Sequence, residues 1–291
     1  MSDEQTAAAK AELQAQTPSE PAEQLPAEPP AQAPAEPAAQ ISADIVGRKI
    51  FFLYPTNSIQ NQIIAELAQQ EYEAYLAKDH VRLFYALKKL GEGVVFVNID
   101  EKISEPEWDK WISSVLTAIP NIKIGVFSSN NAEELRNKYI EKLKITCGFI
   151  HSKVDMSKAV EQVLEILKDL NVKGQRKFLR ASVERESNVT INMPFNGEFV
   201  HGIIKDISVV GVACVFDREL NLLKNSLCKD IQIRLQSVLL NVDAVVFGSR
   251  LIDNEKIYVL LFTQRADTQE RSKIRKYIQQ VLQSKMDPEI N

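Results

Sequence analysis

The sequence has few cysteines, few histidines and no long hydrophobic run. Its three cysteines, Cys147, Cys214 and Cys228, form no CxxC pair, and an odd, scattered set suits a reducing compartment better than a disulfide framework. Its three histidines lack metal-ligand spacing. No apolar run reaches the length of a membrane span, and the first residues show no basic segment followed by an apolar one. We therefore expect a cytoplasmic protein without a metal site and without membrane association.

A strong excess of positive charge is also missing. The formal net charge is -4 over 291 residues, and residues 174–291 carry 17 basic and 14 acidic side chains. This excess is too small for a general nucleic-acid binder, which usually shows a strongly basic face, and no basic recognition helix stands out. We expect no nucleic-acid partner, although a small dianion would suit so slight an excess.

Patterns that carry catalysis are absent as well. We find no Ser/His/Asp set, no glycine-rich loop that would cradle a nucleotide and no cluster with metal-ligand spacing. The sequence therefore predicts a protein that is not an enzyme and that needs no catalytic cofactor.

Residues 1–46 consist mainly of Ala, Pro, Glu and Gln. They contain seven of the twelve prolines, eight acids and one base, and no aromatic residue precedes Phe51. Such a composition cannot bury a core, so it predicts a disordered acidic tail. The tail acts either as a tether or decoy arm over a basic site, or only as a solubilising segment.

From residue 47 to residue 173, short apolar runs alternate with segments of helical periodicity. Strands are expected at 50–53, 72–76, 94–97, 124–127 and 147–150, and helices at 59–67, 81–90, 108–119, 135–143 and 160–170. Five such βα units predict an α/β domain, with a parallel sheet covered by helices on both faces.

This layout resembles the receiver domain of two-component signalling. Receivers hold Mg²⁺ with an acidic pair after the first strand and phosphorylate an Asp at the end of the third. The residues near the receiver positions here are Tyr54, Pro55 and Thr56 after the first strand, Asn98 and Asp100 at the third, Ser128 at the fourth and Lys153 at the fifth. Because the acidic pair is missing, we expect a degenerate scaffold for partner contact or dimerisation. A response regulator driven by phosphorylation is the alternative.

Beyond about Gly174 the pattern changes to closely spaced short strands with turn residues between them. Strands are expected at 181–184, 188–193, 199–207, 211–216, 230–235, 241–249 and 257–262. This spacing predicts an antiparallel barrel or sandwich over residues 174–291. A final helix at 267–283 has one apolar stripe, which is expected to cap the barrel or to pair with a partner helix.

Two short motifs lie in this second part. The first is RxxxR, formed by Arg176 and Arg180, and it is placed at the junction before the first strand. The second is DxSxxG, formed by Asp206, Ser208 and Gly211, and it lies between two expected strands. Each motif alone is weak, because RxxxR is common on surfaces and Asp-x-Ser before Gly is ordinary turn chemistry. Their order, spacing and strand context are more specific together.

With these motifs, residues 174–285 resemble the PilZ family, whose members bind the bacterial second messenger cyclic di-GMP. The resemblance implies that Arg176 and Arg180 contact guanine and phosphate, since the planar guanidinium pairs with both. Lys177 would add a further cation.

By the same resemblance, Asp206 would accept hydrogen bonds from the guanine edge and Ser208 would donate or accept beside it. Both point to one face of a strand if they lie two residues apart on it. Gly211, which lacks a Cβ, would permit a tight bend or a close backbone approach.

The resemblance implies a second-messenger receptor that controls motility, exopolysaccharide or virulence. Ligand binding would order residues 175–180 and pass to a protein partner by a rearrangement between the domains. The alternative is a PilZ-like interaction scaffold that binds no nucleotide. A homodimer is compatible with either reading.

Overall fold

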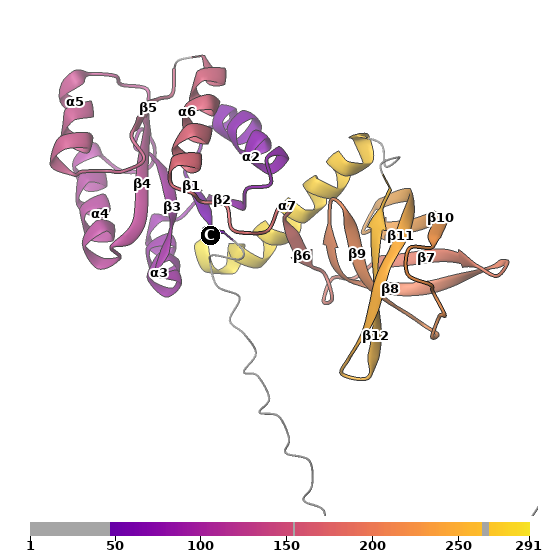
Figure 1. Ribbon diagram of the computed structural model, residues 1–291. Coiled ribbons are helices and arrows are strands. Elements are labelled where there is room, and N and C mark those ends of the chain that lie inside the picture. Colours follow the sequence, from indigo (N-terminus) through magenta and orange to yellow (C-terminus); the bar gives the residue numbers. More distant parts are fainter. Residues whose placement is uncertain (1–46, 154, 264–267) are drawn as a thin grey trace, which may run out of the picture. The chain divides into compact units, whose positions relative to one another are not determined.

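Two separate sheets organise the protein, as the computed structural model shows (Figure 1). The structure describes residues 47–153, 155–263 and 268–291, which belong to one compact unit. The predicted acidic tail at 1–46 and the predicted first residue of the last helix, Asp267, lie outside the described residues. The proposed boundary near Gly174 stays a prediction.

The first sheet has five parallel strands in the order β2-β1-β3-β4-β5. These strands are β1 (Ile50–Leu53), β2 (Ala74–Ala77), β3 (Glu92–Asn98), β4 (Asn121–Ser128) and β5 (Phe149–His151). The strands are continuous apolar runs because both faces of the sheet are buried. In β1, Phe51 and Leu53 join one hydrophobic core while Ile50 and Phe52 join the other. The predicted α/β fold is confirmed.

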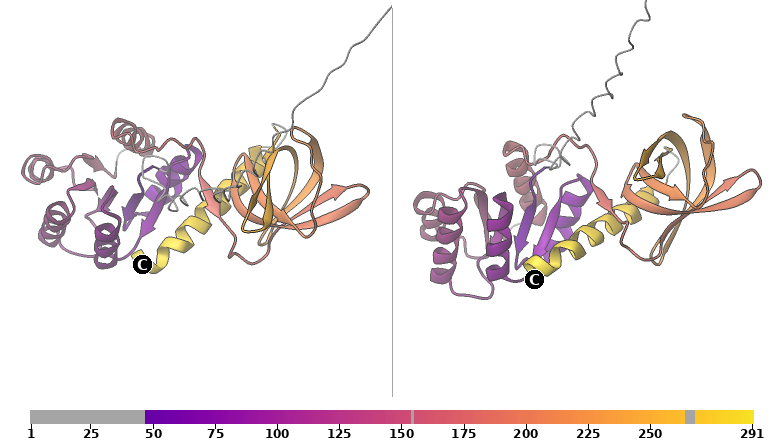
Figure 2. Two further views of the ribbon diagram at one scale, coloured as in Figure 1. Left: turned by 60° about the horizontal axis from the view of Figure 1, so that its bottom comes forward. Right: turned by 90° about the horizontal axis from the view of Figure 1, so that it is seen from below.

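Helices cover both faces of this sheet (Figures 1 and 2). They are η1 (Ile59–Ile64, a π-helix), α2 (Ala65–Gln69), α3 (His80–Leu90), α4 (Glu105–Ala118), α5 (Glu133–Asn137), η2 (Lys138–Lys142, a second π-helix) and α6 (Met156–Asp169). Side chains of η1, α2 and α6 pack on one face, and those of α3, α4 and η2 pack on the other. Local signals set the ends of α3, because the Asp79 carboxylate caps its first turn and Gly91 takes a left-handed φ of 76° after its last.

The second sheet closes into a barrel. Its strands are β6 (Arg180–Ser182), β7 (Val189–Phe195), β8 (Glu198–Ser208), β9 (Gly211–Phe216), β10 (Leu227–Leu235), β11 (Val238–Ile252) and β12 (Glu255–Phe262). Strand β8 pairs with both β7 and β9, which joins the two ends of the β7-β10-β11-β12-β9 series into a six-stranded barrel. The short β6 adds to the end of β8. The barrel alternative of the sequence prediction is therefore correct.

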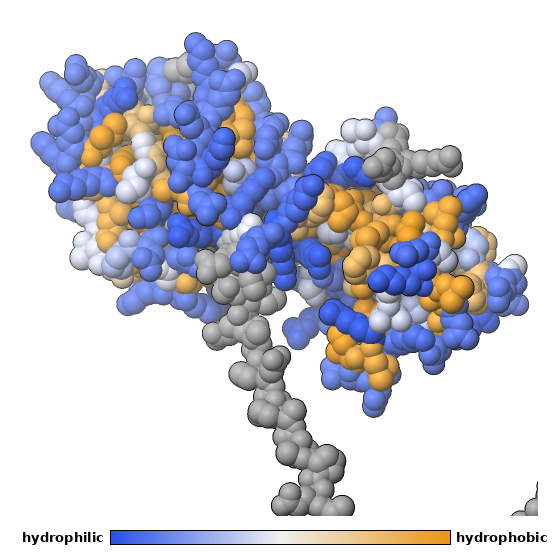
Figure 3. Space-filling model, in the orientation of Figure 1, coloured by the Kyte–Doolittle hydropathy of each residue, from blue (hydrophilic) through white to orange (hydrophobic). Residues whose placement is uncertain are grey.

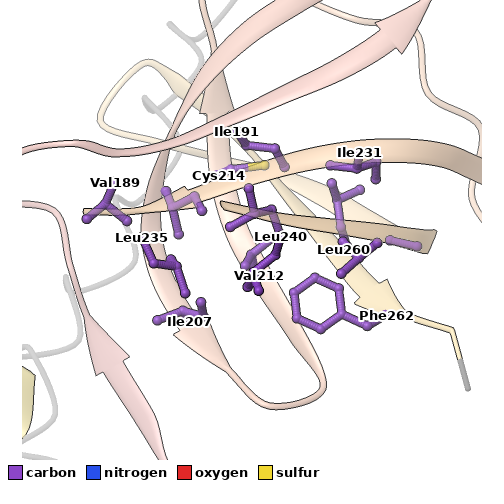
Figure 4. Packing of buried hydrophobic residues seen from close by; sticks show 14 of the residues in the cluster. Val189, Ile191, Ile207, Val212, Cys214, Ile231, Leu235, Leu240, Leu260 and Phe262 are labelled. Atoms are coloured by element: carbon purple, nitrogen blue, oxygen red, sulfur yellow. The ribbon is translucent and has the colours of Figure 1, made fainter. Parts of the chain in front are cut away.

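Alternate residues of the barrel strands fill its interior (Figure 4). Ile191 of β7, Cys214 of β9 and Leu260 of β12 are all fully buried. Cys147, Cys214 and Cys228 are free cysteines, of which Cys147 and Cys214 are buried. Burial raises the pKa of the Cys214 thiol to about 12, because the thiolate would lose its hydration.

The last helix, α7 (Thr268–Ile290), is longer than predicted. The sequence predicts an end near residue 283, where the first apolar stripe ends. The first half of α7 does pack on the barrel, through Ile274 and Ile278 among others. Its second half buries Ile290 in the core of the parallel sheet, with Met286 packed beside it. Burial in this second core extends the helix through Pro288, three residues before the end of the chain.

Amide side chains of α7 also bond to the open edge of the parallel sheet. The pairs are Gln279 with Ala74 and Gln283 with Leu76, and Asn291, directly after the helix, bonds to Lys78. The Gln283 amide both accepts from the Leu76 N–H (2.8 Å) and donates to its carbonyl oxygen (2.9 Å). The spacings of the first two pairs match, because four helix residues rise about 6 Å and two strand residues about 6.6 Å. The helix therefore satisfies the backbone groups of an edge strand. Within the described ranges no helix is long and apolar enough to cross a membrane.

Candidate ligand-binding site

Strand pairing brings the two motifs together. Strand β6 runs antiparallel to the end of β8, with Arg180 opposite Ser208 and Ser182 opposite Asp206. Directly opposed residues of such a pair have Cβ atoms about 4.5–5.5 Å apart. The prediction that both arginines precede the first strand holds for Arg176 only, because Arg180 is the first residue of β6.

The paired motif residues lie on the outer face of the barrel. Ala181 of β6 and Ile207 of β8 are buried in the core, so their chain neighbours on each strand point the other way. The β8–β9 pairing shifts register between Ile204 and Asp206. This bulge moves Asp206 off the inward-facing series, and bulges often re-aim a side chain in this way.

Asp206 is partly buried among positive charges. Burial raises the pKa of this carboxyl group, and the charges of Arg180, Arg176 and Lys285 act against that rise. Lys285 belongs to α7 and was not among the predicted site residues. The structure thus gathers one carboxylate and three cations at the end of β8.

The two arginines of the first motif have donors to spare. Among the residues that the structure describes, neither Arg176 nor Arg180 forms an ion pair or a side-chain hydrogen bond. Arg180 is exposed and Arg176 is half-buried. Lys177 is exposed, and its ammonium lies 5.5 Å from the centre of the Phe178 ring. Each guanidinium has five N–H donors, so both can hold an anion or a guanine edge.

Ser208 and Gly211 shape the turn between β8 and β9. The buried Ser208 hydroxyl donates to the Gly211 carbonyl oxygen at 3.2 Å. Gly211 lies against β12, where a Cβ would collide with the carbonyl oxygen of Leu260. The glycine of the second motif thus permits the close backbone approach that was one of its two predicted roles.

Replacing Gly211 with alanine should lower the free energy of unfolding by about 1–3 kcal/mol, as overpacking of a tight site does. Gly248→Ala is the matched control, because a Cβ on this barrel glycine meets no atom within 4 Å. Urea unfolding of both variants checks the prediction. Equal stability of the two would show that β12 yields to the added methyl group.

A strained residue lies next to the segment before β6, residues 174–179, which carries most of the first motif and which we call the linker. Glu71 follows α2 with a φ of 61°. Its N–H bonds to the Ala68 carbonyl oxygen, and the next N–H, of Tyr72, bonds to the Leu67 carbonyl oxygen. Glycine usually takes this left-handed position after a helix, and another residue there costs free energy. Strain of this kind often accompanies a functional contact.

The Glu71 carboxylate supplies such a contact. One of its oxygens accepts from the backbone N–H of Leu179 at 3.1 Å, and the other accepts from Nε of Arg275 at 2.8 Å. Leu179 lies inside the RxxxR motif, and Arg275 lies on α7. The Glu71 side chain is only 9% exposed. One buried carboxylate of the α/β part thus holds both the linker and the last helix, an arrangement we name the Glu71 contact.

The linker encloses little space. The cavity lined by Glu71, Arg176 and Leu179, among others, has a volume of about 30 Å³, enough for no more than a few water molecules. A cyclic dinucleotide does not fit there, so a ligand held by Arg176 needs either the outer face of β6 and β8 or a displaced linker.

The residues at the receiver positions fix loops. Asn98 is buried and donates from Nδ2 to the Tyr54 carbonyl oxygen at 3.0 Å. The Asp100 carboxylate accepts from the Ser128 hydroxyl at 2.8 Å and from the N–H of Ser129. The polar groups of Asn98, Asp100 and Ser128 therefore form hydrogen bonds within the protein. In the described part of the chain, no three His, Cys, Asp or Glu residues lie so that they could hold a metal ion.

No family model matches the sequence, and no curated protein matches it either. Solved structures do match each part. The PilZ domain of YcgR from Escherichia coli, a structure with c-di-GMP, is 12% identical with a TM-score of 0.35 and covers 39% of this chain and 96% of its own. MrkH of K. pneumonia, solved as a c-di-GMP complex, is 21% identical with a TM-score of 0.34 and covers 40% of this chain and 56% of its own.

A response regulator from Thermotoga maritima is 18% identical, with a TM-score of 0.35, and covers 42% of this chain and 99% of its own. The two resemblances that the sequence suggested, to PilZ proteins and to receiver domains, are thus both found among solved structures.

Proposed function

We propose that the protein is a cytoplasmic, non-enzymatic receptor for cyclic di-GMP that binds its ligand on the outer face of β6 and β8. The observation that carries the proposal is the register that sets Arg180 opposite Ser208 and beside Asp206. The ligand has two phosphates and two guanines. Unpaired guanidinium groups suit the phosphates and guanine O6 and N7, and a carboxylate suits the N1–H and amino groups of guanine.

The Glu71 contact supports a route from the ligand to the α/β part. A ligand that engages Arg176 and Arg180 pulls on the linker between them, and Leu179 lies in that linker. Breaking the bond from the Leu179 N–H to Glu71 would also loosen Arg275 and with it α7. Ligand binding would in this way change the placement of the barrel and the α/β part, each of which packs against a different half of α7.

The output of such a receptor would be a protein contact, and the barrel offers an apolar surface for it. Leu227, Val245 and Leu261 form a cross-strand row on the outside of β10, β11 and β12, and Phe247 of β11 is 57% exposed. Hydrophobic patches are visible on the barrel in Figure 3. Grouped exposed apolar side chains commonly mark interaction sites. Motility, exopolysaccharide synthesis and virulence are the processes such a contact would control.

A calorimetric titration of the full-length chain with cyclic di-GMP tests the proposal, with GTP as competitor. We expect saturable binding that GTP does not displace and that weakens as ionic strength rises, since arginines holding a dianion are screened by salt. Absence of heat, together with an unchanged melting temperature at high ligand concentration, would contradict it. The apolar row on the barrel would then favour a scaffold that binds protein only.

Glu71→Ala should tighten ligand binding by about 2- to 10-fold. In the wild type the ligand must break the hydrogen bond between Glu71 and Leu179, which contributes about 0.5–1.5 kcal/mol to the free state, whereas the variant has no such bond to break. It should also lower the melting temperature, since Arg275 loses its partner. Glu66→Ala is the control, because the side chain of this helix residue bonds only to the exposed Gln70 side chain among the described residues. Weaker binding by Glu71→Ala than by Glu66→Ala would show that the Glu71 contact organises the site and does not restrain it.

A further inference from the structure

The last helix reaches the face that carries the candidate site. The ammonium group of Lys285 on α7 donates to the backbone carbonyl oxygen of Ser182 in β6. Ser182 is the residue directly opposite Asp206 in the β6–β8 pairing. Helix α7 also contacts both β6 and β8. One exposed lysine of the helix is thereby brought to the edge of the two site strands.

Lys285 has bonding capacity left. An ammonium group has three N–H donors, and the Ser182 carbonyl oxygen uses one of them. In the described part of the chain no carboxylate lies within ion-pair distance of Lys285. Its charge nonetheless acts on Asp206, because it opposes, along with Arg180 and Arg176, the rise in pKa that burial causes in that carboxyl group. The lysine is thus near the acid of the site without being neutralised by it.

We infer that Lys285 binds a phosphate group of the ligand, so that helix α7 forms part of the site. The inference rests on the proposed function and extends it to a residue outside both motifs. It follows from the division of tasks among the cations. The flat guanidinium groups of Arg176 and Arg180 suit guanine edges as well as phosphate, whereas an ammonium is a compact charge that suits phosphate.

The position of Lys285 gives the ligand a second connection to the α/β part. Two residues before it, Gln283 bonds to both backbone groups of Leu76 in the edge strand β2. Six residues after it, Asn291 bonds to Lys78. A ligand that holds Lys285 therefore acts on the helix segment that is attached to β2, independently of the Glu71 contact.

The test compares three variants of the full-length chain in cyclic di-GMP titrations at two salt concentrations. Lys285→Gln should weaken binding about fivefold, the factor that corresponds to about 1 kcal/mol for one exposed ion pair. Its affinity should also depend less on salt, because one charge contact is gone. Lys285→Arg keeps the charge and should retain most of the affinity. Lys273→Gln, another exposed lysine of α7, should bind like the wild type.

The outcomes separate the two proposals. If the wild type binds and Lys285→Gln binds as well with the same salt dependence, Lys285 only attaches α7 to β6 and the inference is wrong. If Lys285→Arg is as weak as Lys285→Gln, the role depends on lysine geometry at Ser182 and the phosphate contact is again refuted. If the wild type itself does not bind, the receptor function fails, and the inference fails with it. Melting temperatures of all variants report whether Lys285→Gln remains folded.

Discussion

Replacing Arg180 with alanine is expected to weaken the binding of cyclic di-GMP by about 10- to 150-fold, since a hydrogen bond to a charged group contributes about 1.5–3 kcal/mol and each 1.4 kcal/mol is tenfold. Arg180 opposes Ser208 across the β6–β8 pair and is exposed. Its loss removes a forked donor that no other residue on these strands replaces. Calorimetric titration of wild type and variant at the same salt concentration gives the ratio directly.

Two controls make this result specific. Arg180→Lys keeps the charge but loses the planar fork, so its affinity should fall between those of the wild type and Arg180→Ala. Arg234→Ala removes an exposed arginine from β10, on the far side of β7 from β8 in the strand order, and should leave binding unchanged. Equal losses for Arg180→Ala and Arg234→Ala would indicate a diffuse effect of net charge and would remove the basis for this site.

Most of the fold could be predicted from hydrophobic pattern. The runs around Phe52 and Val95 are apolar without interruption because parallel strands are buried on both faces, and each is followed by a segment of helical period. The barrel strands alternate instead, as strands with one wet face do. What the pattern could not supply was the closure of the barrel through a second partner of β8, because pairing partners leave no mark on a single strand.

The end of α7 shows the limit of pattern in another way. The stripe that includes Ile278 and Val281 ends where the barrel ends, so the helix was expected to stop there. It continues because a second set of apolar residues meets a different core. The amides at 279 and 283 have the i, i+4 spacing of a solvated helix face, and only the structure shows that they bond to β2.

The candidate site was predictable in composition but not in arrangement. RxxxR and DxSxxG name five residues, yet the contact between Arg180 and the second motif depends on strand register, which turn geometry and packing decide. Lys285 lies 74 residues beyond Gly211 and belongs to no motif. Glu71 carried one usable signal, a charged residue where a helix ends and glycine is usual, but its partners become visible only in three dimensions.

Asp206→Ala is expected to weaken binding about 10- to 150-fold, the cost of losing a charge-assisted acceptor for the guanine edge. Only the ionised carboxylate can accept from both the N1–H and the amino group of guanine. Burial raises the pKa of Asp206, so the carboxylate takes up its proton at a higher pH than a solvated aspartate does. As pH is lowered, the affinity of the wild type should therefore begin to fall at a correspondingly higher pH. The affinity of Asp206→Ala should not change over the same pH interval. Titrations at a series of pH values measure both curves.

The same raised pKa predicts the opposite effect on stability. A carboxyl group whose pKa is higher in the folded than in the unfolded state favours folding at low pH, and this contribution is lost as pH rises from about 3.9 through the folded-state value. Wild type should therefore lose stability relative to Asp206→Ala as pH rises from about 4 through the raised folded-state pKa, which urea unfolding at matched pH values measures. If Asp206→Ala binds weakly and becomes more stable relative to the wild type as pH rises, then Asp206 serves ligand binding at a cost in stability. A constant stability difference across this range would mean that its surrounding arginines and Lys285 already offset the burial of the charge.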